Sequence, residues 1–235
     1  MRDMTEPLQP SSLREQFGDI DIYLFDQLLR GRIGDGMRVL DAGCGSGRNL
    51  VFMLRAGMDV YGIDENPDAI AAVRRQAARL APELLAERFT VQAVDAMSFE
   101  SASMDVVVSS AVLHFARDEA HFNGMLNEMW RVLAPGGLLF CRLASTIGIE
   151  NQVKSLGRAE AGDDPVPFFN DSDPSRRPRS DPRRHVLPDG STRFLVDAAF
   201  LLEHTKRLGG TLLDPLKTTV VHDSRSMTTW VVKKG

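Results

Sequence analysis

The sequence predicts an α/β fold, a doubly wound and mostly parallel sheet of seven strands with helices on both faces. Three observations favour it. Apolar runs bounded by turn signals alternate with helical patterns along the chain, which is typical of a parallel sheet. The first of these runs ends in a glycine-rich turn. The last two are joined by a short polar turn, which indicates an antiparallel hairpin at the end of the sheet.

Five apolar runs predict the parallel strands. The fourth, at 104–110, is continuous, as expected of a strand buried on both faces. The predicted strands are residues 37–43, 59–64, 88–94, 104–110 and 138–145, and the closing hairpin joins 212–222 to 227–235 through residues 223–226.

Helical patterns separate these runs. Asn66 is placed to cap a helix and Pro67 suits its first turn, while Gly57 is placed to end the helix before it. A periodic apolar set predicts a later helix, which the turn at 134–137 ends. The predicted helices are residues 48–56, 67–80, 118–133 and 197–208.

The first 33 residues are expected to form an N-terminal helical cap. Within residues 11–33, apolar side chains recur at helical spacing and predict a helix packed on the core. The members of this stripe are Phe17, Ile20, Leu24 and Leu28.

The amino-acid composition changes over residues 163–191, which contain six prolines, six aspartates and five arginines. This composition predicts a long loop or lid rather than a second domain, so residues 1–235 are expected to form a single domain. Phe168 and Phe169 could cap a pocket when such a lid closes. The arginine-rich run 176–184 could bind phosphate or an anionic substrate, or be a solvated loop, because residues 163–191 carry a formal charge of about −1.

Composition excludes several classes. Hydrophobic residues make up 43% and charged residues 26%, as in a soluble globular protein. A net charge of −4 gives no global attraction to nucleic acid or an anionic membrane. The start of the chain lacks the pattern of a signal peptide, and no apolar run approaches the roughly 18 residues of a membrane span. Cys44 and Cys141 suggest neither a disulfide framework nor a metal site, so a reduced, cytoplasmic setting is expected.

The stretch VLDAGCGSGRN, from Val39 to Asn49, is the most informative motif. Alternating glycines between a strand and a helix bring backbone N–H groups close to a ligand at the sheet edge. A dinucleotide site needs G-x-G-x-x-G, but Arg48 stands at the third position of that pattern. The spacing here is G-x-G-x-G, which argues against a nicotinamide-dependent oxidoreductase.

This loop resembles the first motif of class I S-adenosylmethionine-dependent methyltransferases, whose fold is Rossmann-like, and Asp41 stands where that family carries an acidic residue. Asp64 ends the second strand and Asp95 follows the third, as the family's later acids do. The run 128–142, EMWRVLAPGGLLFCR, is similar to the helix, turn and strand that follow the active site in small-molecule members. The resemblance covers residues 37–145 and extends to the closing hairpin.

The resemblance implies S-adenosylmethionine as cofactor. The glycines would admit its methionine end and Asp41 would hold its amino group, directly or through water. Asp64 would bind the ribose hydroxyls, and Asp95 with a neighbouring N–H would bind the adenine. The thiol of Cys44 would only fill space. The expected cofactor-binding residues are Asp41, Gly43, Cys44, Gly45, Gly47, Asp64, Glu65, Asp95, Ala96, Met97 and Ser110.

Methyl transfer from a sulfonium is an in-line displacement, to which the protein contributes alignment and a dry pocket. A thiolate acceptor needs no general base, whereas a hydroxyl or ammonium acceptor usually does. His114, after the fourth strand, is the candidate base, or else a core or pocket-wall histidine. His204 is expected to pack or to contact the surface. Asp19, Asp21 and Tyr23 could face the acceptor if the cap closes.

A small-molecule acceptor is predicted. Residues 109–112 read SSAV, where enzymes acting on base amino groups or glutamine amides carry an Asn/Asp-Pro-Pro-aromatic motif. This difference argues against nucleic acid as the acceptor. Residues 40–64 look like the corresponding part of tellurite-resistance-type methyltransferases, which points to small, soft or anionic acceptors such as chalcogen oxyanions or thiols. The long proline- and arginine-rich loop departs from the compact members.

Two alternatives stay open. One is a protein that binds S-adenosylmethionine as a regulator or sensor and transfers no methyl group. The other is a methyltransferase that holds a macromolecule through the arginine-rich loop. The glycine loop and the three acids fit both.

Overall fold

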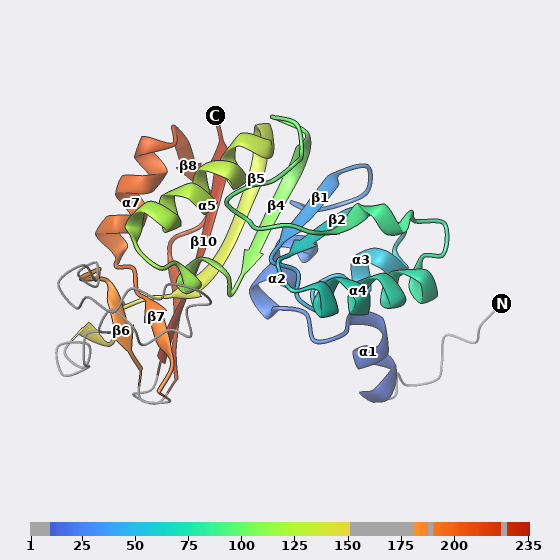
Figure 1. Cartoon of the computed structure of the whole chain (residues 1–235), viewed down its shortest axis with the longest axis horizontal. Helices are drawn as coiled ribbons and strands as arrows, with labels where there is room; N and C mark the ends of the chain where they lie inside the picture. Colours follow the sequence, from blue (N-terminus) through green and yellow to red (C-terminus); the bar gives the residue numbers. More distant parts are fainter. Residues whose placement is uncertain (1–9, 151–180, 188–189, 222–224) are drawn as a thin grey trace, which may run out of the picture.

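A mixed sheet lies at the centre of the protein (Figure 1). The computed structural model describes residues 10–150, 181–187, 190–221 and 225–235. Its parallel strands are β1 (Arg38–Ala42), β2 (Asp59–Asp64), β3 (Phe89–Val91), β4 (Met104–Ser110) and β5 (Leu133–Ala144). They lie in the order β3-β2-β1-β4-β5 and pair in parallel. The predicted α/β class with a mostly parallel sheet is confirmed.

The other side of the sheet is antiparallel. β10 (Arg225–Lys234) pairs with β5, and both β8 (Gly210–Leu212) and β9 (Lys217–Val221) pair with β10. The hairpin β9–β10 confirms the predicted C-terminal hairpin. The prediction of one strand over 212–222 is wrong, because Pro215, which has no N–H to donate, lies in the break between β8 and β9. The described sheet therefore has eight strands rather than the predicted seven.

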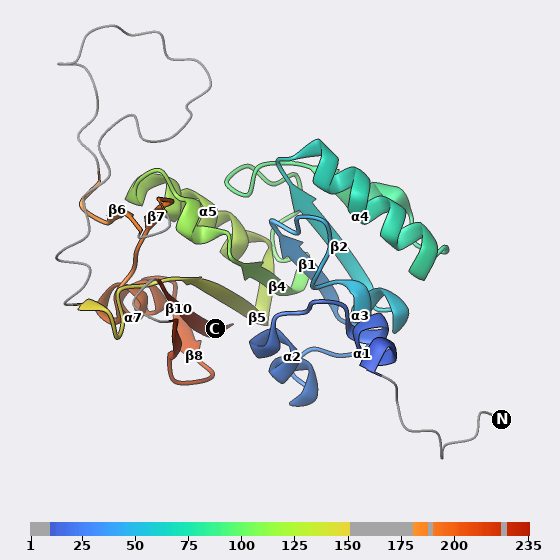
Figure 2. The same ribbon diagram turned by 90° about the horizontal axis from the view of Figure 1, so that it is seen from below.

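Helices cover both faces of the sheet. Figure 2 shows α5 (Glu119–Val132) and α2 (Ile22–Leu29) on opposite sides of β4 and β5. α7 (Ala198–Arg207) packs in the same hydrophobic cluster as α5, while α3 (Val51–Arg55) and α4 (Pro67–Leu80) share the cluster that contains α2. Within the described ranges, no helix is both long and apolar enough to cross a membrane.

Each face of the sheet has its own hydrophobic cluster. Phe122 and Trp230 belong to the cluster beneath α5 and α7, and Leu24 belongs to the one beneath α2. Strand residues alternate between the two, so Cys141 faces the first cluster and Phe140 the second. Because side chains two positions apart in a strand share a face, these clusters show which polar side chains face α2.

The N-terminal cap consists of two helices, α1 (Pro10–Phe17) and α2, where one continuous apolar stripe was predicted. The chain turns between them at Gly18, whose φ is +64°, and Asp21 caps α2 by accepting the N–H of Tyr23 at 2.9 Å. Leu24 is fully buried, and the other members of the predicted stripe are partly buried. The prediction of a cap packed on the core is confirmed.

Two elements of the parallel half, the helix α3 and the strand β3, are shorter than predicted. α3 begins at Val51 rather than Arg48, because the chain turns at Gly47, whose φ is +85°. β3 ends at Val91 rather than Val94, since β3 is an edge strand with β2 as its one neighbour. The early end of β3 leaves Asp95 in the loop that follows it.

A two-stranded hairpin lies beyond the carboxyl end of β5 (Figure 1). It consists of β6 (Arg184–Val186) and β7 (Thr192–Phe194), and a bridge between Ser145 and Val196 ties the following segment to the end of β5. The predicted loop over 163–191 is therefore wrong at β6. Most of that segment, including Phe168, Phe169 and residues 176–180 of the arginine-rich run, lies outside the described residues, so the lid stays a prediction.

Candidate functional site

The carboxyl ends of β1, β2 and β4 meet at one edge of the sheet, because β1 pairs in parallel with both of the others. From β1 the chain crosses to β2 and β3 on one side and then to β4 and β5 on the other. Such a switch point leaves a crevice outside the strand ends, where open α/β sheets bind their ligands. Asp41, Asp64 and Ser110 all lie there.

The three glycines of the loop have different roles. Gly43 and Gly47 have φ values of +83° and +85°, and a Cβ on either would lie under 3 Å from a valine side chain, that of Val112 or Val73. Gly45 also has a positive φ, +53°, but a Cβ there would meet nothing within 4 Å. Gly43 and Gly47 are therefore required by packing, and Gly45 is where a ligand can approach the backbone.

Asp64 holds the loop in place. One of its carboxylate oxygens accepts the N–H of Gly45 at 2.9 Å, and the other accepts the N–H of Asn66 at 2.9 Å. Asn66 in turn caps α4 by accepting the N–H of Asp68. Glu65, between these groups, is exposed. Asp64 therefore joins the glycine loop, the end of β2 and the start of α4.

Asp41 is a buried carboxylate with no partner. Its side chain is 1% exposed, and neither oxygen has a hydrogen-bond partner among the described residues. Burial raises the pKa of Asp41 to about 7, although the charge of Arg48 and the nearby side chain of Asn49 oppose this shift. A buried polar group without a hydrogen bond is costly, so this position favours a cationic or hydrogen-bond-donating ligand.

The loop after β3 places Asp95 beside α5, where its carboxylate lies 3.4 Å from Nε2 of His121. The two N–H groups predicted to contact adenine already donate within the protein. That of Ala96 donates to the carbonyl of Ala93 at 3.2 Å, and that of Met97 donates to Glu128 at 3.1 Å. The assignment of this loop to adenine stays a prediction.

The two cysteines are buried and free. Burial raises the pKa of the Cys44 thiol and that of the Cys141 thiol far above the usual range, so neither forms a thiolate nucleophile. The backbone N–H of Cys44 donates to the carbonyl of Ile63 at 2.8 Å, which ties the glycine loop to β2. This geometry suits a small filler at position 44.

The predicted base, His114, lies in the short helix η2 (Leu113–Phe115), just beyond β4. It is buried, and its Nδ1 accepts the backbone N–H of Ala144 at 3.2 Å. Burial, aided by the charge of Arg193, lowers the pKa of His114 to about 3. The neutral ring of His114 links η2 to β5 through its acceptor nitrogen. Because that nitrogen is already occupied, the geometry does not support a role as general base. The catalytic role stays an untested prediction.

The second histidine, His204, packs in the core. It is 5% exposed, and its two ring nitrogens lie 2.8 Å from the carbonyl of Phe200 and 2.9 Å from Oδ1 of Asn123. The prediction of a packing role is confirmed.

Asp21 joins the cap to the site, a role that the sequence left open. Its side chain is 6% exposed, and its carboxylate accepts the hydroxyl of Ser110 at 3.3 Å and lies 3.2 Å from Nε of Arg142. Its own N–H donates to Asn49 at 3.0 Å. The hydroxyl of Ser110 also accepts from Arg48 at 2.9 Å. In contrast, Asp19 is exposed and pairs with Arg14.

Sequence reasoning missed three members of this cluster: Arg48, Asn49 and Arg142. Arg48 and Asn49 belong to the glycine-loop motif, so their position could have marked them as site residues. Their contacts with the N-terminal cap are not visible from the sequence. No pattern marks Arg142, which lies near the end of an otherwise apolar strand. Ala111, directly after β4, has φ +66°, and such left-handed strain in a non-glycine residue tends to occur at functional sites.

We expect Gly43→Ala to destabilise the protein more than Gly45→Ala. Both substitutions force a side chain into a left-handed conformation, which costs about 1–2 kcal/mol. Only Gly43→Ala also overpacks against Val112, which adds about 1–3 kcal/mol. Urea unfolding of both variants checks the order, and equal losses would contradict the assignment of Gly45 to the ligand side.

The pKa of Asp41 predicts a pH-dependent effect of Asp41→Asn. Because folding raises this pKa from 3.8 to about 7, the native state holds a proton that the unfolded chain loses, and stability falls as pH rises from 4 to 7. The variant cannot lose this proton, so its free energy of unfolding should not fall in the same way. Relative to the wild type it should therefore rise across that range by up to about 4 kcal/mol, at about 1.4 kcal/mol per pKa unit.

Urea unfolding of ligand-free protein at several pH values measures this difference. The matched control is Asp19→Asn, which removes an exposed carboxylate. A difference between Asp41→Asn and the wild type that stays constant with pH would mean that Asp41 is not a buried acid with a raised pKa.

Comparison with known proteins agrees with this geometry. Residues 40–141 match the model of a family described as a methyltransferase domain. A ubiquinone biosynthesis O-methyltransferase from Methylocella silvestris is 35% identical over 106 residues, which are 45% of this chain and 39% of that protein. A thiol S-methyltransferase from Mus musculus is 37% identical over 120 residues, 50% of this chain and 47% of that protein. The chain thus spans less than half the length of either relative.

Among solved structures, a SAM-dependent methyltransferase from Methanosarcina mazei has a TM-score of 0.62 at 19% identity, with 88% of this chain and 96% of that one covered. A likeness at this identity concerns the fold. The narrower similarity to tellurite-resistance-type enzymes stays a prediction. The motif, the family match over residues 40–141 and the fold agree, and this part of the chain is similar to the methyltransferase domain of class I S-adenosylmethionine-dependent enzymes.

Proposed function

We propose that this protein transfers a methyl group from S-adenosylmethionine to a small-molecule acceptor by in-line displacement. The observation that carries the proposal is the unpartnered carboxylate of Asp41 at the switch point, in the same loop as the open face of Gly45. A buried anion that lacks a partner fits the ammonium group of the cofactor's methionine end. The methyltransferase names of the relatives support the same reaction class.

The residues present fit the cofactor. Asp41 would receive the ammonium group, and the backbone beside Gly45 would accept the methionine portion. Asp64, half-buried beside Gly45, would contact the ribose hydroxyls while it holds the loop. Ser110, at the end of β4, and Glu65, at the end of β2, complete the proposed contacts, and Asp95 with Ala96 and Met97 would line the adenine end.

The protein's own contribution is alignment and exclusion of water. When bound, the cofactor supplies an electrophilic methyl group on a positively charged sulfur. Asp21 holds the cap on the ends of β4 and β5, which covers the site from one side. A soft acceptor such as a thiolate then needs no base from the protein.

A small acceptor is favoured over a macromolecule. The two relatives are named for ubiquinone biosynthesis and for thiol methylation, and a net charge of −4 does not favour nucleic acid. In the arginine-rich run, Arg183 is occupied by Asp197 at 3.0 Å. The free state of both buried cysteines suits the proposed cytoplasmic setting.

Release of S-adenosylhomocysteine tests the function. The protein is incubated with S-adenosylmethionine and a panel of thiols, phenols, carboxylates, amines and chalcogen oxyanions, and we expect turnover on one class. Calorimetry should show that Asp41→Asn weakens cofactor binding about tenfold or more, because a hydrogen bond to a charged group contributes roughly 1.5–3 kcal/mol. Asp19→Asn should bind as the wild type does.

The outcomes separate the alternatives. Cofactor binding without turnover on any acceptor would favour a regulator or sensor. Unchanged affinity in Asp41→Asn would remove the assignment of the ammonium site.

We expect His114→Asn to keep turnover within about tenfold of the wild type. Its amide oxygen can still accept the N–H of Ala144, and loss of a general base would cost 10²–10⁴-fold. The pH profile of kcat between 5 and 8 should contain no ionisation from His114, since its pKa lies near 3. A larger loss, with a pH limb that disappears in the variant, would restore His114 as the base.

A further inference from the structure

A row of polar side chains crosses four neighbouring strands on the face that α2 covers. Ser110 of β4 is in register with Arg142 of β5, Arg142 with Thr229 of β10, and Thr229 with Lys217 of β9. Residues in register on paired strands have side chains on the same face. Phe140, two positions before Arg142, belongs to the cluster beneath α2, so the whole row faces α2.

Two buried polar atoms in the middle of this row have no hydrogen-bond partner in the part of the chain that the structure describes. They are Nη1 of Arg142 and Oγ1 of Thr229, and Thr229 is only 3% exposed. Buried polar groups are nearly always paired, and leaving one unpaired costs about 1–3 kcal/mol. Two such groups on directly opposite residues indicate one shared partner, and both can donate to it.

The charges around these groups favour an anion. Arg142 and Arg48 both lie near Asp21, at 3.2 and 3.9 Å, so two cations share one carboxylate. Lys217, at the end of the row, already pairs with Asp26 at 3.4 Å. Arg142 also stacks on the ring of Tyr23, 4.5 Å from its centroid, which fixes the guanidinium plane. A planar carboxylate suits a guanidinium and a hydroxyl side by side.

The row begins at the proposed cofactor site. Ser110 accepts a hydrogen bond from Arg48 of the glycine loop, and Asp41 is in register with Val108, two residues before Ser110. Arg142, on β5, is therefore two strands away from the end of β1, where the cofactor's methionine portion would lie, with Ser110 of β4 between them. A molecule bound at Arg142 and Thr229 could reach the transferred methyl group.

Resting on the proposed function, we propose that Arg142 and Thr229 bind a carboxylate of the methyl acceptor between the sheet and α2. The acceptor is therefore a small carboxylic acid, and its reacting atom points from this row toward Ser110. Asp21 and Tyr23, at the start of α2, hold Arg142 in position.

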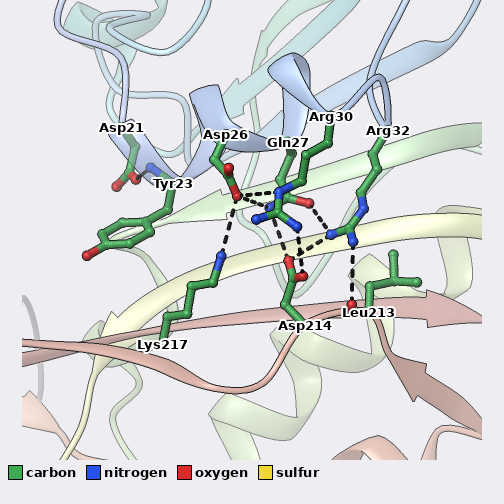
Figure 3. Close-up of polar contacts among 9 residues, drawn as sticks. All are labelled: Asp21, Tyr23, Asp26, Gln27, Arg30, Arg32, Leu213, Asp214 and Lys217. Carbon is green, nitrogen blue, oxygen red and sulfur yellow. Dashed lines mark hydrogen bonds and ion pairs between the residues drawn. The ribbon is translucent and has the colours of Figure 1, made fainter.

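Access to this site requires α2 to move. Figure 3 shows a polar network at the C-terminal end of α2. It joins α2 and the residues directly after it to β9 and to the segment between β8 and β9. The carboxylate of Asp214 forms ion pairs with the guanidinium groups of Arg32 at 2.7 Å and Arg30 at 3.5 Å. The carboxylate of Asp26 forms an ion pair with Arg30 at 2.8 Å. The side chains of Arg30 and Arg32 are partly exposed, but that of Asp214 is only 9% exposed and Leu24 of α2 is fully buried. Movement of α2 therefore has a cost that ligand binding must offset.

Calorimetry on the full chain tests the proposal directly. Benzoate, salicylate and 3-mercaptopropionate are each titrated against their amides, with and without S-adenosylhomocysteine. We expect at least one acid to bind tenfold or more tightly than its amide. Arg142→Gln should remove this preference and Thr229→Val, a nearly isosteric change, should reduce it at least threefold. Arg207→Gln, an exposed arginine on α7, is the matched control and should keep it.

Two further measurements keep the result interpretable. If Arg142→Gln lowers the melting temperature strongly, Arg142→Lys retains the charge and should keep part of the preference. Equal binding of acids and amides by the wild type, or an unchanged preference in Thr229→Val, would overturn the inference and indicate a buried water. Turnover without acid preference would overturn it and leave the proposed function standing, whereas acid binding without turnover on any acceptor would support the site and contradict the function.

Discussion

The parallel pairing of β1 with both β2 and β4 is the constraint on which the site depends. It brings three strand ends to one edge and forces the chain to turn sharply after β1. That turn has room for no side chain at Gly43, where Val112 follows β4. Sheet register, the glycine loop and the placement of Asp41 are therefore consequences of one topological choice, since a different neighbour for β1 would separate these groups.

Two buried aspartates at this edge show how the protein distributes the cost of burying charge. Asp21 is surrounded by donors from the cap, from Ser110 and from Arg142, so its burial fastens the cap to the sheet. Asp41, on β1, makes no direct hydrogen bond among the described residues, although Arg48 and Asn49 lower its pKa, and under the proposed function its burial prepares a site for a cation. The first carboxylate stabilises the fold, and the second lowers stability in return for ligand recognition.

The sequence predicted most of the parallel half of the fold, because periodicity and turn residues are local signals. α4 with its Asn66 cap was found, since capping depends on residues close in sequence. The predictions of strand boundaries failed where pairing with a strand distant in sequence determines them. β6 at Arg184–Val186 exists because it pairs with β7, and the split of β8 from β9 follows from how each pairs with β10.

The fold class, the glycine loop and the order of the three acids could be read from the sequence, because each follows from residue type at fixed spacing along the chain. That Asp21 reaches Ser110, and that Nη1 of Arg142 and Oγ1 of Thr229 lie on paired residues with no hydrogen bond among the described residues, could be seen only in the tertiary structure. These residues lie about 90 positions apart in each pair. Contacts over such separations depend on sheet register and on the packing of α2, which no local pattern encodes.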